Sequence, residues 1–205
     1  MKTKKILVSI LVLSIMCCIG TSAFAGRGGA QGNQTGAGLA PLTDFEIVTL
    51  KHMREEEKLA RDVYIAMYEQ WVSAIFANIT ESEQKHMDAI KSLLDKYGIP
   101  DPASPDRGVF DDESLQEMYD ELISRGEISL PGALKVGAFI EELDIADLQA
   151  AIKETSKIDL QAVYGNLLNG SINHLKAFVS HIEVLGVDYV AQHLTQKEVD
   201  ALLAQ

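Results

Sequence analysis

Four long segments of the sequence repeat their apolar side chains every three to four residues, which is the period of one face of an α-helix. We expect these helices, followed by a short terminal one, over about 43–71, 80–97, 131–153, 159–185 and 195–203. No stretch of useful length alternates apolar and polar side chains as a half-buried strand does. The pattern therefore predicts an all-α domain over residues 42–205.

The connections between these segments predict how the helices are arranged. The first and second segments are joined by a short connection, as are the third and fourth, so each pair is expected to be antiparallel. The connection over 98–131 is long and holds an extra helix near 112–124. Two antiparallel pairs joined by one long crossover is the arrangement of a ferritin-like four-helix bundle. An up-down-up-down bundle with a decorated loop is the alternative.

Local signals mark several helix ends. Thr43 and Glu46 have the spacing of a capping box, in which each residue satisfies a free N–H group of the other. Gly98 suits the end of the second helix, and Pro131 suits the first turn of the third.

The N-terminal segment predicts export. Met1–Lys5 carries three lysines, Ile6–Gly20 is apolar, and Ala23–Ala25 offers the small residues that a signal peptidase prefers. We expect residues 1–25 to be a signal peptide cleaved near Ala25, which would place the protein in the periplasm or outside the cell. An uncleaved membrane anchor is the alternative. Residues 26–41 are Gly-rich and predict a flexible linker.

The charge of the chain excludes some partners. The net charge is −12, and removal of the three lysines of the signal would make it −15. Nucleic-acid binding needs a basic face, and anionic lipid repels an acidic protein, so we expect neither partner once the signal is removed. Both cysteines, Cys17 and Cys18, lie in the signal, so the mature chain would have no disulfide and no thiolate metal ligand.

Each of the four long segments places a Glu or a His within its apolar face. Glu83 and His86 are three residues apart and therefore lie one turn apart on one helix face. A buried carboxylate costs several kcal/mol unless it is paired, neutralised or metal-bound. A divalent cation would satisfy such groups together, and a mixed oxygen and imidazole set suits iron, manganese or zinc. The predicted ligands are Glu57, Glu83, His86, Glu141 and His174.

Simpler interpretations exist for each residue alone. Glu83 also has the spacing of a capping-box partner of Thr80, and Glu57 belongs to a run of three glutamates of the kind that usually faces water. His174 alone would more often be a hydrogen-bonded core residue than a ligand. The joint pattern on four helices favours the metal site. Three other residues are assigned to the surface: His52, Glu142 and His193.

Two of these segments resemble known metalloproteins. Glu57-Lys-Leu-Ala-Arg-Asp-Val-Tyr64 resembles the first helix of rubrerythrin-like proteins, and Glu83-Gln-Lys-His86 resembles the Glu-x-x-His motif of the ferritin-like superfamily. The stretches MREEEKLARDVY, SEQKHMDAI, VGAFIEELDI and GSINHLKAF more closely resemble an uncharacterised ferritin-like family catalogued as a domain of unknown function. This resemblance covers most of residues 43–185.

The resemblance implies a carboxylate-bridged di-iron centre. In it Glu83 bridges the metals, His86 binds one and His174 binds the other, while Glu57 and Glu141 complete the set. The superfamily has a second Glu-x-x-His on the fourth helix, but this chain has Ser171 three residues before His174. The missing carboxylate leaves several alternatives open. A water or hydroxide could take its place, the second site could be weaker, the centre could hold a single metal, or Asp144 could be an additional ligand.

The function that follows is an exported ferritin-like metal-binding protein with oxidase or peroxidase activity. Two Fe(II) ions about 3.5–4 Å apart could share the two-electron reduction of peroxide or oxygen. Tyr64 lies about two helical turns from Glu57 and is a further candidate, as a hydrogen-bond donor to the site. A non-catalytic module that binds or sequesters metal, and a metal-free helical interaction domain, are the alternatives. The electron donor and a homodimeric assembly are left open.

Overall fold

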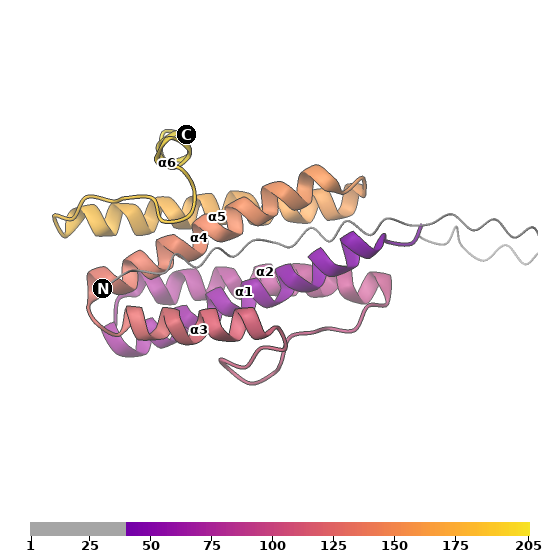
Figure 1. Cartoon of the computed structure of the whole chain (residues 1–205), viewed down its shortest axis with the longest axis horizontal. Coiled ribbons are helices and arrows are strands. Elements are labelled where there is room, and N and C mark those ends of the chain that lie inside the picture. The colour runs from indigo at the N-terminus through magenta and orange to yellow at the C-terminus, as the bar shows by residue number, and fades with distance from the viewer. Residues whose placement is uncertain (1–39) are drawn as a thin grey trace, which may run out of the picture. The chain divides into compact units, whose positions relative to one another are not determined.

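The computed structural model describes residues 40–205, and six α-helices contain most of them (Figure 1). They are α1 (Asp44–Trp71), α2 (Ala74–Tyr97), α3 (Glu113–Gly126), α4 (Leu130–Glu154), α5 (Ile158–Val184) and α6 (Gln196–Leu203). Residues 40–205 contain no strand, which confirms the predicted all-α fold. None of these helices combines the length and apolar character needed to span a bilayer. The predicted signal peptide and nearly all of the predicted linker lie outside the described residues.

The helix ends follow the local signals with one exception. The predicted capping box is present at α1, where Thr43 Oγ1 accepts a hydrogen bond of 3.2 Å from the Glu46 N–H group. Helix α2, however, begins at Ala74, six residues before the predicted start, because its apolar face already begins with the buried Ile75 and Phe76. Thr80 is therefore inside the helix, and the capping-box interpretation of Glu83 is wrong.

The helices form two antiparallel pairs. Val72–Ser73 joins α1 to α2, and residues 155–157 join α4 to α5. The crossover over residues 98–129 returns along the bundle and carries α3, which packs against both α1 and α4 (Figure 1). As a result, α2 and α4 run in the same direction. Helix α1 packs on α4 and α2 packs on α5, so that each helix of one pair faces one helix of the other.

The crossover is fixed to α1 by buried charged side chains. The Arg54 guanidinium donates two hydrogen bonds, each 2.9 Å long, to the carboxylate of Asp101. The buried Lys58 ammonium donates to Asp62 on its own helix at 2.5 Å and to the carbonyl oxygen of Asp106 at 2.9 Å. These contacts explain why a strongly charged stretch of α1 is buried: part of it faces the crossover instead of water.

The apolar core of the bundle is divided into two clusters. One is built around the rings of Tyr64, Phe76 and Phe178, which lie 5.3–6.3 Å apart between ring centroids. The other is built around Leu50 and Ile90 with residues from α4 and α5. Between the clusters each of the four long helices contributes polar residues, so the predicted ligands lie in a polar layer enclosed at both ends by apolar side chains.

Glu142 on α4 is buried, which corrects its assignment to the surface. Its carboxylate accepts hydrogen bonds from the backbone N–H groups of Gln192, His193 and Leu194 at 2.6–3.1 Å, and from the hydroxyl of Tyr189. The segment before α6 therefore covers this face of α4. The periodicity of α4 alone carries no sign of that segment, which is why Glu142 was expected to be solvated.

We expect Glu142→Gln to lower the free energy of unfolding by about 3 kcal/mol, because an amide NH₂ would face backbone donors in a buried position. Urea unfolding of the purified variant measures this change. Glu154→Gln, an exposed position on the same helix, is the matched control and should stay within about 0.5 kcal/mol of wild type. Equal stability of the two variants would show that Glu142 does not hold the C-terminal segment.

Candidate metal centre

The five predicted ligands converge in the polar layer of the bundle. His86 Nδ1 lies 3.1 Å from Glu57 Oε2 and 2.8 Å from Glu83 Oε2. His174 Nδ1 lies 2.8 Å from Glu83 Oε1 and 3.4 Å from Glu141 Oε2. Each histidine nitrogen is thus close to two carboxylates, and each oxygen of Glu83 faces a different histidine. The arrangement forms two groups, each able to hold a metal ion, that share Glu83.

The sequence places these side chains in the layer by helical spacing. Glu83 and His86 are one turn apart on α2, so one helix face supplies both. Glu57, Glu141 and His174 come from the three other long helices, α1, α4 and α5. A fold that brings the inner faces of four helices together therefore assembles the site without a loop.

The second group contains buried polar atoms whose close partners are one another. Glu83 Oε1, Glu141 Oε2 and His174 Nδ1 are all buried, and none of them has a hydrogen-bond partner outside this group within residues 40–205. The His174 nitrogen lies 2.8 Å from the first oxygen and 3.4 Å from the second, so three ligand-type atoms converge on one point that no other polar group satisfies. Two carboxylate oxygens and an imidazole nitrogen are a donor set that divalent transition metals accept. The residues of this group therefore fit a metal ion.

Two neighbouring hydroxyl groups contact the ligands. Tyr64 donates a hydrogen bond of 2.6 Å to Glu141 Oε1, as expected for the predicted donor, and leaves Oε2 free to face His174. Ser82 Oγ lies 3.0 Å from His174 Nε2. A partner on one ring nitrogen fixes the tautomer and leaves the other nitrogen for a metal. Ser82 carries no metal-site signal in the sequence beyond its position next to Glu83.

Burial and pairing shift the pKa values of the ligands strongly. Burial raises the pKa of Glu57 to about 8, and the contact with His86 offsets this only in part. Burial alone would also raise the pKa of Glu83, but its contacts with His174 and His86 outweigh burial and lower the pKa to about 2. Burial would lower the histidine pKa values, yet the surrounding carboxylates raise them to about 10 for His86 and about 11 for His174.

These pKa values predict that metal binding releases protons. At pH 7 both His86 and His174 are protonated without metal, whereas a metal needs the unprotonated nitrogen, so at least one proton should leave per ion bound. Metal affinity should then increase as the pH rises from 6 to 8. Calorimetric titration in two buffers of different ionisation enthalpy counts the protons. Binding that is independent of buffer and pH would contradict the assigned ligands.

Two other residues considered in the sequence lie outside the two groups. Asp144 is buried, but its oxygens do not belong to any of the candidate metal groups within residues 40–205. Burial, together with the nearby charges of Glu57 and Glu141, raises the pKa of Asp144 well above its ordinary value, which favours the neutral carboxyl. The Ser171 hydroxyl donates to the carbonyl oxygen of Leu167 on its own helix at 3.2 Å and so does not point to the centre as a ligand.

Gly170 on α5 makes room for His86. A Cβ atom at this position would lie 2.6 Å from His86 Nε2, well inside van der Waals contact. We expect Gly170→Ala to displace the imidazole and weaken metal binding about 10- to 100-fold, as changes behind a metal ligand commonly do. Gly165→Ala on the same helix is the control, since a Cβ there meets no atom within 4 Å. Competition titration with a chromophoric chelator measures both variants, and equal affinities would contradict this role of Gly170.

Fold and site together define an all-α bundle with a buried carboxylate and histidine cluster. Residues 46–205 match the family described as "Uncharacterized protein domain (DUF2202)", and the chain belongs to this family. It is 48% identical over 165 residues to the uncharacterized protein MJ0754 of Methanocaldococcus jannaschii, covering 80% of this chain and 89% of that protein.

Two solved structures resemble this one. The crystal structure of hypothetical protein MJ0754 from Methanococcus jannaschii DSM 2661 aligns with a TM-score of 0.79 and 45% identity, over 83% of this chain and 98% of that chain. A DUF305 fragment from Deinococcus radiodurans aligns with a TM-score of 0.54 over 71% of this chain and 99% of that one. At 14% identity, this second likeness concerns the fold alone.

Proposed function

We propose that the protein is an exported metalloprotein of the ferritin-like superfamily whose bundle centre binds two divalent metal ions, with iron the first candidate. The observation that carries the proposal is the position of Glu83, whose two oxygens face His86 and His174 separately. Glu57 would complete the ligands of the first ion, and Glu141 would complete those of the second. Manganese and zinc accept the same donor types.

The order and direction of the helices support the ferritin-like assignment. Such folds have two antiparallel helix pairs joined by one long crossover, with metal ligands projecting from all four helices into the bundle. In this chain the long crossover is formed by residues 98–129, which connect α2 of the first pair to α4 of the second.

The proposed chemistry is oxidase or peroxidase activity. When bound, a pair of iron ions would supply two electrons to oxygen or peroxide. The protein side chains keep the site dry and fix its geometry: Glu83 holds the two positions together, and Tyr64 orients Glu141. The side chains of His86 and His174 are 12% and 11% exposed. A small molecule would therefore reach the centre past these two histidines.

The test is to add Fe(II) without oxygen, count the ions bound, and then admit oxygen. We expect two ions at the bundle centre of each chain and oxidation faster than in buffer. His86→Ala should lose tight binding, while His181→Ala, an exposed histidine on α5, should behave as wild type. Full iron stoichiometry in His86→Ala would overturn the ligand assignment.

The same experiment separates the second candidate function, a module that binds or sequesters metal without turnover. Ser171 in the place of a fourth-helix carboxylate favours it, because the centre then has one anionic ligand fewer. Two bound ions that are oxidised no faster than in buffer would indicate this function. A protein that binds no metal would instead be a helical interaction domain.

Export is the remaining part of the proposal and rests on the sequence of residues 1–25. Expression in a bacterial host with N-terminal sequencing of the mature protein tests it. We expect the chain recovered outside the cytoplasm to begin near Gly26. An uncleaved Met1 in the cytoplasmic fraction would contradict export.

A further inference from the structure

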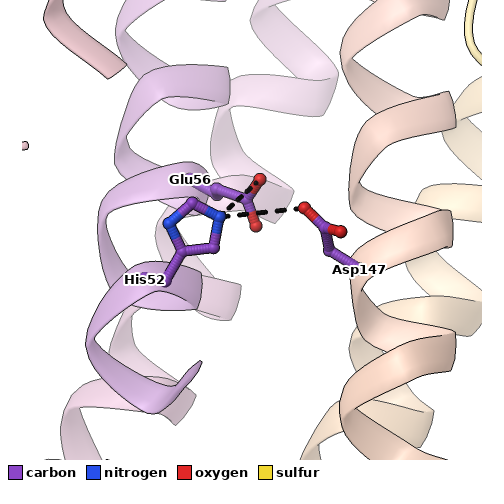
Figure 2. Close-up of side chains that lie close together, drawn as sticks. All are labelled: His52, Glu56 and Asp147. Atoms are coloured by element: carbon purple, nitrogen blue, oxygen red, sulfur yellow. Dashed lines mark ion pairs between the residues drawn. The ribbon is translucent and has the colours of Figure 1, made fainter. Parts of the chain in front are cut away.

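A third group of ligand-type side chains lies between α1 and α4. His52 and Glu56 are one turn apart on α1, and Asp147 faces them from α4 (Figure 2). His52 Nε2 lies 3.2 Å from Glu56 Oε1 and 3.7 Å from Asp147 Oδ2. One ligand atom from each residue lies within 4.8 Å of the other two. The group shares no residue with the bundle centre.

Glu56 supplies a buried oxygen that has no partner. Its side chain is only 9% exposed, and Oε2 makes no hydrogen bond within the described part of the chain. Figure 2 shows the Glu56 carboxylate between the His52 ring and Asp147. The Glu56 carboxylate contacts His52 through Oε1 alone, so Oε2 lacks a donor in a buried position, which is costly. A cation placed among these three residues would satisfy it.

The other two residues leave the group open to water. The side chain of His52 is 26% exposed and that of Asp147 is 17% exposed, so an ion can enter from solvent. Two carboxylates balance the charge of a divalent ion, and one imidazole selects a transition metal over calcium or magnesium. Three protein ligands leave further positions for water, as in open metal sites.

The side chains of this group also point in a different direction from the ligands of the bundle centre. Glu56 and Glu57 are neighbours in sequence, so their side chains leave the helix about 100° apart. Glu57 points to His86, whereas Glu56 points to His52. The charged stretch of α1 is therefore divided among the crossover, the bundle centre and this third group.

We propose that His52, Glu56 and Asp147 form a second, solvent-accessible site for one divalent transition-metal ion, separate from the bundle centre. This site rests on its own contacts and does not depend on the proposed function.

Equilibrium dialysis of the mature protein against Zn²⁺, which undergoes no redox reaction, tests the site. We expect three ions per wild-type chain and two in His52→Gln and in Asp147→Asn. His181→Gln, an exposed histidine far along α5, is the control and should keep three. Thermal melts without metal check that the variants fold. Unchanged zinc stoichiometry and affinity in both His52→Gln and Asp147→Asn would overturn the proposal.

A background without the central ions separates this site from the proposed function. In Glu83→Gln we expect one zinc ion to remain, and the further change His52→Gln should remove it. If wild type binds one ion only, and His52→Gln loses that ion, the second site stands while the two-metal centre falls. If wild type binds two ions and His52→Gln keeps both, the centre stands and the second site falls.

Discussion

Replacing Glu83 with glutamine is expected to remove both tightly bound metal ions from the bundle centre. Glu83 is the one residue with an oxygen in each of the two groups, so no other single change reaches both. The amide keeps the size of the side chain but removes its charge and replaces one oxygen with a group that cannot bind metal. Removing one partner of a buried charge pair costs about 3–5 kcal/mol, which corresponds to a roughly 100- to 4000-fold loss of affinity.

Metal content after gel filtration and a chelator competition titration measure this loss. Glu81→Gln is the matched control, because it makes the same chemical change at an exposed position two residues away on the same helix. The control should retain the central ions with wild-type affinity. A Glu83→Gln protein that keeps both central ions, or loses only one, would show that Glu83 does not bridge them.

Removing the metal should lower the melting temperature of the wild-type protein considerably. An ion that binds only the folded state stabilises it by about 2.7 kcal/mol when its concentration is one hundred times its Kd, so two central ions contribute about 5 kcal/mol. For a domain of this size each kcal/mol corresponds to about 2–4 °C. We therefore expect EDTA to lower the melting temperature by roughly 10–20 °C, and added Fe(II) or Zn²⁺ to restore it.

Calorimetry with and without EDTA provides the measurement. The double variant with Glu83→Gln and His52→Gln should melt at one temperature in both conditions, because it lacks the bridging ligand and the histidine of the outer group. A wild-type melting temperature that EDTA does not change would favour the metal-free interaction domain over both metal-binding functions.

The sequence predicted the features that depend on one helix at a time. Capping residues such as Thr43 fixed helix ends, and the long crossover followed from where the apolar periods stopped. The position of Glu57 or Glu141 within an apolar stripe indicated an inward direction, and the structure brings these residues together with Glu83, His86 and His174. The period of the apolar residues can be read from the sequence, so a polar residue that interrupts an apolar stripe can be recognised there as well.

The features that were missed depend on contacts between elements. Glu142 appeared solvated because nothing in α4 shows that the segment before α6 covers it. His52 was assigned to the surface, since its partner Asp147 is on another helix. Gly170 carries no side-chain signal, and its role exists only where α5 approaches His86. Such roles follow from packing and not from the period of a single helix.

Anomalous X-ray scattering from crystals of the mature protein loaded with Fe(II) under anaerobic conditions tests the central claim most directly. Two iron peaks are expected in the polar layer, about 3.5–4 Å apart, with one oxygen of Glu83 on each. His86 and His174 should lie on different peaks. A single peak, or the absence of iron from the layer while the five side chains keep their positions, would contradict a two-metal centre.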